Sequence, residues 1–472
     1  MVLPSRRYGA TFVALALVLV ACSNAATPAP TGTASATGTP GGATATPAGP
    51  TPTASPAGIT CPKDSEQIEV ASWWTTGGEG NGLTKLFEKF NADNPGLCAY
   101  NAAIAGGAGS AAQAIFKARV LGGAPPDTLQ VHMGHELLDT YVNGVDPAVL
   151  DALEASVIDP SKFPDGVVKI ISGADGKVYT VPVNIHRANE MWYNKSVFES
   201  NNLTAPKTWA EFFTVADTLK GKNITPLAVG DNGIWAWGMV FEDILIGTLG
   251  VDGFNKLWTD ATAWNDPKVT EALTTLEKVY GYVNSDHNAL SWDQANQLVI
   301  DGKAAMTLMG DWANGDYVAK NFTGYGWAPA PGSDGIYQAL ADSFPLPTQA
   351  GNTLGDATKQ AAHKDNVKKL LTFMASAVGQ DIFNPYKGSI PANKDAGHPA
   401  AGDLQYNDYQ KSALTDWQSN TVVPSMEHGA AASPAFKSAL EAALTAMQGG
   451  ADVAATQTAM AQAATSALSA SQ

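Results

Sequence analysis

Cysteine and positive charge are both scarce in this sequence of 472 residues. It contains 3 cysteines, too few for a disulfide-rich scaffold or for a metal site built from several cysteines. Charged residues make up 15% of the chain, against about 25% in typical soluble domains. The 28 basic residues are outnumbered by 44 acidic ones, for a net charge of −16. Nucleic acids and anionic membrane surfaces are bound through clustered cations, so the composition argues against both as partners.

No apolar run in the sequence is long. The run at 10–21 has about 12 residues, too few to cross roughly 30 Å of hydrocarbon. Because it follows two arginines, it is typical of a secretory signal peptide, which we predict at residues 1–21. Residues 19–22, Leu-Val-Ala-Cys, resemble the bacterial lipobox. That resemblance implies a lipid on Cys22 and a location on the outer face of the cell membrane; a plain cysteine is the alternative.

Charge and aromatic side chains are both missing from the stretch that follows. Residues 23–58 consist of Ala, Thr, Pro, Gly and Ser with one Asn. Such a segment buries too little apolar surface to offset the entropy of ordering it. We therefore predict a lipid-anchored linker at 22–59.

Two cysteines remain for the exported chain, Cys61 and Cys98. Disulfides form in oxidising compartments, so we predict that these two residues are paired. Closing a loop of this size contributes on the order of 4 kcal/mol in the chain-entropy model. Two buried free thiols are the alternative.

Strand and helix patterns alternate in the body of the chain, whose length allows two or three domains. A short apolar run at 68–71 is followed by helical spacing at 83–90, a helix at 111–121 and a second strand at 128–131. This alternation predicts an α/β architecture with a largely parallel sheet. Further helices are predicted at 209–219, 268–282, 292–300, 365–375 and 434–447, with a last surface helix after Gly449.

Aromatic and uncharged polar residues come directly after the predicted strands. Trp73 and Trp74 follow the first strand, Gln130 and His132 the second, and 184–187 a later one. Ligands bind at the carboxyl ends of strands in α/β folds. Tryptophan faces cover the C–H side of a sugar ring, and polar side chains bridge its hydroxyls. The pattern therefore favours an uncharged polyol ligand, although any single tryptophan belongs more often to a core.

The sequence lacks the common motifs of enzymes. The order H-M-G-H-E at 132–136 does not match the zinc hydrolases, there is no G-x-S-x-G, and no Gly-Lys-Ser/Thr follows the glycines near 77 and 106. We therefore predict no metal and no nucleotide. A pair of carboxylates for glycoside hydrolysis stays open, because their spacing is spatial. The available residues are Glu79, Glu190, Asp311 and Asp342.

Six stretches spread over about 320 residues carry a family pattern. They read E-V-A-S-W-W-T-T-G-G-E (69–79), P-P-D-T-L-Q-V-H (125–132), V-P-V-N-I-H-R-A-N (181–189), M-W-Y-N-K (191–195), M-G-D-W-A (309–313) and K-G-S-I-P-A (387–392). In this order they resemble the extracellular solute-binding proteins of sugar ABC importers, family 1, and most of all the subgroup specific for glucose or mannose.

That resemblance implies a type II periplasmic-binding-protein fold, α/β with two lobes and the ligand in the cleft between them. The lobes are expected at 60–183 with 338–385 and at 184–337 with 386–472. The implied function is capture of a monosaccharide (glucose, or mannose or galactose) and its delivery to membrane permease subunits. We expect a monomer, with neither enzymatic activity nor a cofactor. The alternatives are the same fold binding a disaccharide or alditol, and a tethered glycosidase.

The resemblance also implies the sugar-contacting residues, position by position. They are Trp73, Trp74, Glu79, Gln130, His132, Trp292, Trp312, Asp342, Lys387 and His428. Asn184 and His186 are expected near the hinge or behind the contacts. The loop after Asp342 departs from the family pattern, being longer and lacking a lysine, and S-I-P-A is followed by Asn rather than Arg.

Overall fold

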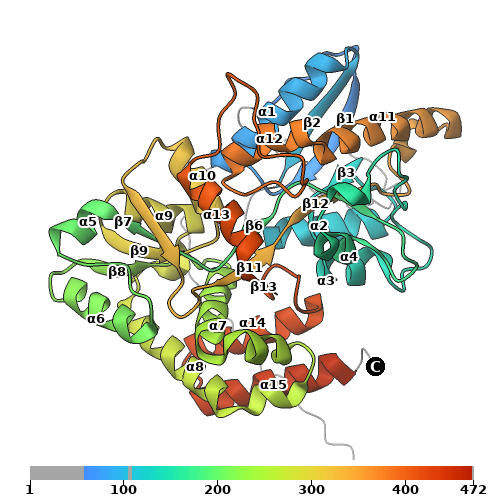
Figure 1. Cartoon of the computed structure of the whole chain (residues 1–472). Coiled ribbons are helices and arrows are strands. Elements are labelled where there is room, and N and C mark those ends of the chain that lie inside the picture. The colour runs from blue at the N-terminus through green and yellow to red at the C-terminus, as the bar shows by residue number, and fades with distance from the viewer. Residues whose placement is uncertain (1–57, 105–108, 470–472) are drawn as a thin grey trace, which may run out of the picture. The chain divides into compact units, whose positions relative to one another are not determined.

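The computed structural model describes residues 58–104 and 109–469 (Figure 1). The predicted signal peptide (1–21), the predicted lipid attachment at Cys22 and nearly all of the linker (22–59) lie outside these residues. In the described part of the chain, no helix has the length and apolar character needed to cross a membrane.

Short strands form four separate sheets within the described residues. The strands are β1 (Glu66–Ser72), β2 (Leu97–Ala103), β3 (Thr128–Leu129), β4 (Val131–His132), β5 (Thr180–Pro182), β6 (His186–Arg187), β7 (Glu190–Asn194), β8 (Thr225–Ala228), β9 (Ala304–Leu308), β10 (Tyr325–Pro329), β11 (Ile336–Leu340), β12 (Asp342–Pro345) and β13 (Thr421–Pro424). The sheet orders are β2-β1-β3, β4-β12-β5, β10-β7-β9-β8 and β13-β11-β6.

Parallel and antiparallel strand pairs both occur, so the expectation of a largely parallel sheet is wrong. β1 runs parallel to β2 and β3, but β12 runs antiparallel to β4 and β5, and β7 antiparallel to β9 and β10. A parallel neighbour in the same sheet needs a long crossover connection. β12 instead enters its sheet from β11 of another sheet after a single residue, Ala341. No helix lies between β11 and β12 to reverse the chain. The direction of β12 therefore follows from the direction in which the chain leaves β11.

Helices flank the sheets (Figure 1). They are α1 (Gly77–Asp93), α2 (Ser110–Leu121), α3 (His135–Leu137), α4 (Asp165–Ile171), α5 (Lys195–Ser200), α6 (Trp209–Lys220), α7 (Trp235–Leu257), α8 (Pro267–Val279), α9 (Trp292–Ile300), α10 (Trp312–Ala319), α11 (Ala357–Ala375), α12 (Ala377–Lys387), α13 (Asp408–Ser419), α14 (Pro434–Gln448) and α15 (Val453–Ser469).

The helices with a clear apolar stripe form where the sequence predicts them. In α1 the side chains of Leu83, Leu86 and Phe90 are buried at helical spacing. α9 begins at a capping box in which Ser291 and Gln294 satisfy the free amide groups of the first turn. These local signals place both helices beside the strand ends that carry the aromatic residues.

The helix α7 is not predicted from the sequence. Nearly every side chain of its first half, from Trp235 to Ile246, is buried. A helix covered on all sides has no polar face and hence no amphipathic period to detect. Its first turn and its middle nevertheless supply two residues, Trp235 and Glu242, that matter for the site described below.

A disulfide joins Cys61 to Cys98, with 5.7 Å between their Cα atoms. Cys98 lies in β2, and Cys61 lies in the segment that precedes β1. The bond therefore fixes the start of the described chain to the edge of the first sheet.

Glycines allow α1, α10 and α12 to approach one another backbone to backbone. A Cβ atom on Gly78 would lie 2.6 Å from the carbonyl oxygen of Gly315. A Cβ atom on Gly315 would lie 2.5 Å from the carbonyl oxygen of Lys387 and 2.6 Å from that of Tyr386. Any larger residue at these positions would push the helices apart, because real Cβ atoms do not pack so closely.

Candidate functional site

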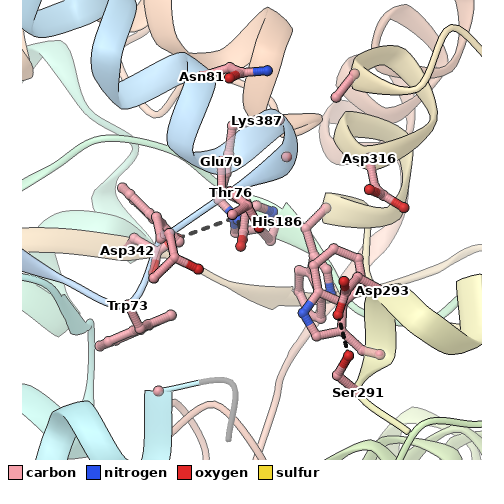
Figure 2. Close-up of a pocket in the computed structure, with 18 of the residues that line it drawn as sticks. Trp73, Thr76, Glu79, Asn81, His186, Ser291, Asp293, Asp316, Asp342 and Lys387 are labelled. Carbon is pink, nitrogen blue, oxygen red and sulfur yellow. Dashed lines mark hydrogen bonds and ion pairs between the residues drawn. The ribbon is translucent and has the colours of Figure 1, made fainter. Parts of the chain in front are cut away.

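A cavity of about 480 Å³ lies where several strand ends and helix starts meet (Figure 2). Nine of the ten residues expected to contact a sugar line it. They are Trp73, Trp74, Glu79, His132, Trp292, Trp312, Asp342, Lys387 and His428.

The tenth, Gln130, lies behind the wall of the cavity. Its side-chain oxygen accepts a hydrogen bond from the backbone N–H of Trp73 at 3.1 Å, and its amide nitrogen donates to Asp342 at 2.9 Å. The geometry therefore gives Gln130 the task of holding two lining residues. Its direct contact with a ligand stays a prediction.

The two adjacent tryptophans have different surroundings. The ring of Trp73 packs on Phe116, with centroids 6.5 Å apart and an interplanar angle of 22°. Gly109, with a φ of +103°, allows this position, because a Cβ there would lie 2.9 Å from the indole. Trp74 is only 1% exposed and packs on Phe383. Trp73 thus presents a ring to the cavity, and Trp74 anchors the same turn in the core.

A second aromatic wall is built from α7, α9 and α10. Trp312 lies in the first turn of α10, and its ring covers Gly310, where a Cβ would come within 2.2 Å. Trp235 of α7 lies 6.3 Å from Trp312, measured between ring centroids. Trp292 opens α9. Aromatic rings from separate elements therefore line the cavity.

Asp342 is the most heavily hydrogen-bonded acid in the cavity. It accepts bonds from Gln130 and Asn184, both at 2.9 Å, and pairs with His186 at 3.1 Å. Burial disfavours its charge, but the bond from His186 and nearby cations outweigh burial and lower the pKa of Asp342. Asp342 is held opposite His132 in the β12–β4 register, so the long loop that follows does not displace it.

His186 connects two buried carboxylates. Its Nδ1 pairs with Asp311. Its Nε2 pairs with Asp342 (Figure 2). Burial opposes protonation of the imidazole, yet Asp311 outweighs it and raises the pKa of His186. The expected place of His186 and Asn184 near the contacts, rather than in front of them, agrees with this geometry.

Two further ion pairs face the cavity. Lys387, with a side chain 2% exposed, pairs with Glu79 across α12 and α1 (Figure 2). The Nδ1 atom of His132 lies 2.7 Å from Glu136. Burial opposes the charge on His132, but Glu136 outweighs it and raises the pKa of the imidazole. The cavity therefore offers charged donors and acceptors that are already oriented.

The four carboxylates considered for glycoside hydrolysis do not form an acid–nucleophile pair here. Glu190 and Asp311 do not line the cavity. Burial raises the pKa of Glu190 to about 8, and its partner is Arg187. Glu79 is held by Lys387, and the lowered pKa of Asp342 removes it as a proton donor. General acid catalysis needs a protonated carboxyl facing the substrate.

The histidines of the H-M-G-H-E stretch point to separate partners. His132 pairs with Glu136, whereas His135 is exposed and pairs with Asp139 at 2.8 Å. Across the described residues, no group of three or more His, Cys, Asp or Glu side chains could hold a metal ion.

Part of the lining carries no signal in the sequence. Asn232 and Trp235 belong to no motif and no repeat. Ser291 and Asp293 flank Trp292 at the start of α9, a position that a helix-start argument could have found. The lining residues not predicted include Asn81, Asn232, Trp235, Ser291, Asp293, Asp316 and Lys320.

Sequence relatives cover most of the chain. The model of the bacterial extracellular solute-binding protein family matches residues 73–381. An uncharacterized ABC transporter extracellular-binding protein of Pyrococcus horikoshii is 36% identical over 82% of this chain and 83% of its own length. A protein of Rhizobium meliloti named "Probable sugar-binding periplasmic protein" is 29% identical over 81% of this chain and 89% of its own length.

A solved structure shows the same fold. The bacterial solute receptor AcbH, described as having an exclusive preference for β-D-galactopyranose, matches with a TM-score of 0.70 and 20% identity over 86% of this chain and 99% of its own. The expected two-lobe α/β periplasmic-binding-protein fold is thereby confirmed. The matched family and these relatives are named as binding proteins or receptors, so the prediction that this chain is not an enzyme is also confirmed.

Proposed function

This chain belongs to the bacterial extracellular solute-binding protein family. From that premise we propose that it captures a monosaccharide as the sugar-binding receptor of an ABC importer. Glucose is the first candidate for that monosaccharide. The observation that carries the proposal is the cavity, in which indole rings meet charged groups already fixed in position. A sugar ring has apolar C–H faces and a rim of hydroxyls, and this lining provides for both.

The aromatic rings supply the contacts to the faces of the sugar. Trp73 presents its indole from one side of the cavity, and Trp312 and Trp292 line it from other elements. Indole rings cover C–H groups with a large, rigid surface at little conformational cost.

The charged residues supply the contacts to the hydroxyls. Asp342 is an acceptor, Lys387 is a donor, and the histidines at 132 and 428 contribute ring nitrogens. Hydrogen bonds to charged groups are roughly twice as strong as those between neutral groups. Because most of these groups already have partners within the protein, they lose little freedom when a ligand binds.

We place the lobes at 60–183 with 338–385 and at 184–337 with 386–472. The sheets β2-β1-β3 and β4-β12-β5 fall wholly in the first set. β11 spans the proposed junction at 337/338. Ligand contacts from both lobes would stabilise the closed form, which then docks on the permease, and the ligand shifts this equilibrium only by its differential affinity for the two forms.

The protein is located outside the cytoplasm, because it belongs to a family of extracellular proteins. Anchoring rests on the signal peptide predicted at 1–21 and the lipid predicted on Cys22. The linker from 22 to 59 would let the receptor, working as a monomer, reach a permease in the same membrane. Mass spectrometry of the membrane fraction would detect the acylated N-terminal peptide.

Titration calorimetry of residues 23–472 against glucose, mannose, galactose, xylose and maltose tests the ligand, with product analysis afterwards. We expect one-to-one binding of glucose, recovered unchanged. Absence of binding to any monosaccharide would contradict the proposal.

A disaccharide is the second candidate, and one feature favours it. Beyond the cluster around Asp342, the cavity continues to Ser291, Asp293 and Asp316 (Figure 2). Lys320 also lines it. These polar groups could accommodate a second sugar ring. A preference for maltose over glucose in the same titration would select this alternative and leave the fold and the receptor role unchanged.

A further inference from the structure

His428 stands at the cavity with its two ring nitrogens in different surroundings. Its ring lies 5.2 Å from that of Trp312 and 5.4 Å from that of His132, measured between centroids. The Nδ1 atom lies 3.1 Å from the hydroxyl oxygen of Ser425. Among the described residues, none provides a hydrogen-bond partner for Nε2. Nε2 is therefore free to contact a ligand. Whether it carries a proton depends on the hydrogen bond that Nδ1 makes.

The Ser425 hydroxyl is itself bound to a buried acid. It donates to Oε2 of Glu242 at 2.9 Å. Glu242 sits in the middle of α7, is 0% exposed, and accepts two backbone bonds as well, from Met426 at 2.6 Å and from Glu427 at 3.2 Å. Three donors thus converge on this carboxylate, and its oxygens have no role except to accept.

The protons in the hydrogen bonds that link Glu242, Ser425 and His428 have a single possible arrangement. A serine hydroxyl has one proton and two lone pairs. Since Ser425 gives its proton to Glu242, its oxygen can only accept from Nδ1 of His428. The imidazole then carries its proton on Nδ1, and Nε2 presents a lone pair to the cavity.

We propose that Glu242, acting through Ser425, is a positioning residue that sets the tautomer of His428, so that the cavity-facing nitrogen accepts a hydrogen bond from a ligand hydroxyl. The ligand half of this inference rests on the proposed function, and the tautomer half does not. Glu242 itself touches no ligand, because it is not among the residues that line the cavity.

The neighbouring histidine has the opposite polarity. His132 meets a carboxylate directly, at 2.7 Å from Glu136, and the pKa of His132 is raised despite burial. The carboxylate of Glu136 thus favours the protonated ring, in which Nε2–H is a donor. Burial and the charges of His132, Lys437 and His186 lower the pKa of His428 well below its ordinary value. The two rings thus form a matched donor and acceptor.

The electrostatic surroundings of Glu242 make its charge sensitive to pH. Burial raises its pKa to about 7, against the opposing effect of the bonds from Met426, Ser425 and Glu427. Lys437 of α14 is engaged by Glu427 at 3.0 Å and by Glu441 at 2.6 Å.

Two other buried carboxyls lie near Glu242. Burial raises the pKa of Asp243, its neighbour on α7, and that of Glu427 well above their ordinary values. Burial therefore disfavours the charged form of both, whereas the pKa of Glu242 stands at about 7.

Protonation of Glu242 would reverse the chain of hydrogen bonds. The carboxyl would donate to Ser425, and Ser425 would donate to Nδ1 of His428. The imidazole, still neutral, would exchange its proton with water in the cavity and carry it on Nε2. The acceptor would become a donor without any change in the net charge of the ring.

The first experiment reads the tautomer directly, by ¹⁵N–¹H correlation of the histidine rings of residues 23–472 without ligand. The His428 signals are assigned by their loss in His428→Gln. At pH 8 we expect protonated Nδ1 and bare Nε2. In Glu242→Gln a carboxamide N–H donor replaces one of the carboxylate oxygens that accept hydrogen bonds. We therefore expect His428 to carry its proton on Nε2 in this variant. Asp243→Asn, a matched change one residue along α7, should leave the signals unchanged.

The second experiment measures the glucose affinity of the same variants. We expect Glu242→Gln to weaken binding about tenfold, as for one lost hydrogen bond, and Asp243→Asn to leave it unchanged. From pH 8 to pH 6 the affinity of the wild type should fall, and that of Glu242→Gln should stay flat. Ser425→Ala replaces Glu242→Gln as the test variant if Glu242→Gln does not fold. Without the Ser425 hydroxyl between Glu242 and His428, we expect a mixture of both tautomers of His428.

The outcomes separate the two proposals. A His428 that keeps its Nδ1 proton in Glu242→Gln, and in the wild type at pH 6, overturns the role of Glu242 whatever the ligand. A tautomer that switches as expected while glucose affinity stays constant overturns the acceptor role of His428. A tautomer that switches in a protein that binds no sugar supports the relay and contradicts only the proposed function.

Discussion

Trp73 and Trp74 show how the site divides its work among single residues. The indole of Trp73 has Gly109 and Phe116 on one side and the cavity on the other. Trp74 is almost fully buried, and the ammonium group of Lys387 lies 5.1 Å from the centroid of its ring. We therefore expect the two rings to respond differently to truncation.

We expect Trp73→Ala to weaken glucose binding by about 1–3 kcal/mol, or roughly 5- to 150-fold in Kd, because it removes the aromatic face from the cavity. The thermal midpoint should change little, since Trp73 is only partly buried. Calorimetric titration and a melting curve give both values. Trp417→Ala is the control, because Trp417 is also partly buried but does not line the cavity. Equal Kd values for the two variants would remove Trp73 from the site.

At the scale of single residues, the sequence predicts chemistry better than position. Strand ends followed by Trp73 or His132 can be recognised from the sequence, and both residues line the cavity. Gln130 follows the same rule but lies behind the wall, because its amide bridges Trp73 and Asp342. Trp235 was missed because it opens a helix that no pattern reveals. Whether a polar side chain faces a ligand or supports a neighbour depends on partners that are distant in the sequence.

Among the elements, α11 is fixed to the first sheet by one histidine. His363 of α11 places Nδ1 2.7 Å from Glu66 of β1 and Nε2 2.7 Å from Asp127, which precedes β3. Two carboxylates require both nitrogens to donate, so the ring is an imidazolium. The hydrogen bond to Asp127 raises the pKa of His363, against the opposing effect of burial.

This contact gives stability a defined pH dependence. A pKa raised in the folded state contributes stability that is fully present below the unfolded value of about 6.5 and is lost as pH rises through the folded value. We therefore expect the melting temperature of the wild type to fall between pH 6 and pH 9 by more than that of His363→Gln. Thermal melts of both proteins at the two pH values measure the difference.

His135→Gln is the matched control for that comparison. His135 also pairs with a carboxylate, Asp139, but is largely exposed, and exposed ion pairs contribute little. Its melting curves should follow those of the wild type at both pH values. If His363→Gln also follows the wild type, the contact does not stabilise α11.

The elements also show where sequence patterns succeed. The predicted bounds of α9 agree with the structure because its capping box and apolar stripe are local. α7 and the direction of β12 were not predicted. The first is buried on nearly all sides, and the second depends on a crossing between sheets. Local rules describe half-exposed elements, whereas buried elements and crossings depend on the whole chain.

For the molecule as a whole, the contact between α1 and α10 has the greatest mechanical importance. In our assignment Gly78 of α1 belongs to the first lobe, and Gly315 of α10 belongs to the second. Gly78 meets the carbonyl group of Gly315 with no side chain between. This contact can exist only when the two lobes are together.

We expect Gly78→Ala to favour the open form, because its Cβ would lie 2.6 Å from the carbonyl oxygen of Gly315 and 2.2 Å from that of Tyr386, both in the second lobe. Gly78 lines the cavity, but the added methyl group would meet two carbonyl groups of residues that do not line it. A weaker affinity together with a shift toward the open form would therefore come from closure. Small-angle scattering with saturating glucose and calorimetry would measure both effects. Gly166→Ala, at a glycine with open space around it, is the control. An unchanged Kd in Gly78→Ala would mean that the contact does not limit closure.

The same contact means that affinity in this receptor is also a property of its backbone. Every 1.4 kcal/mol added to the free energy of closing lowers the apparent affinity about tenfold while each atom that recognises the sugar stays in place. Mutations at such glycines would shift the sugar concentration range over which the receptor responds. They would not change which sugar it selects. Selection for poorer or richer surroundings could thus act on a contact between backbone atoms and leave the side chains that recognise the sugar unchanged.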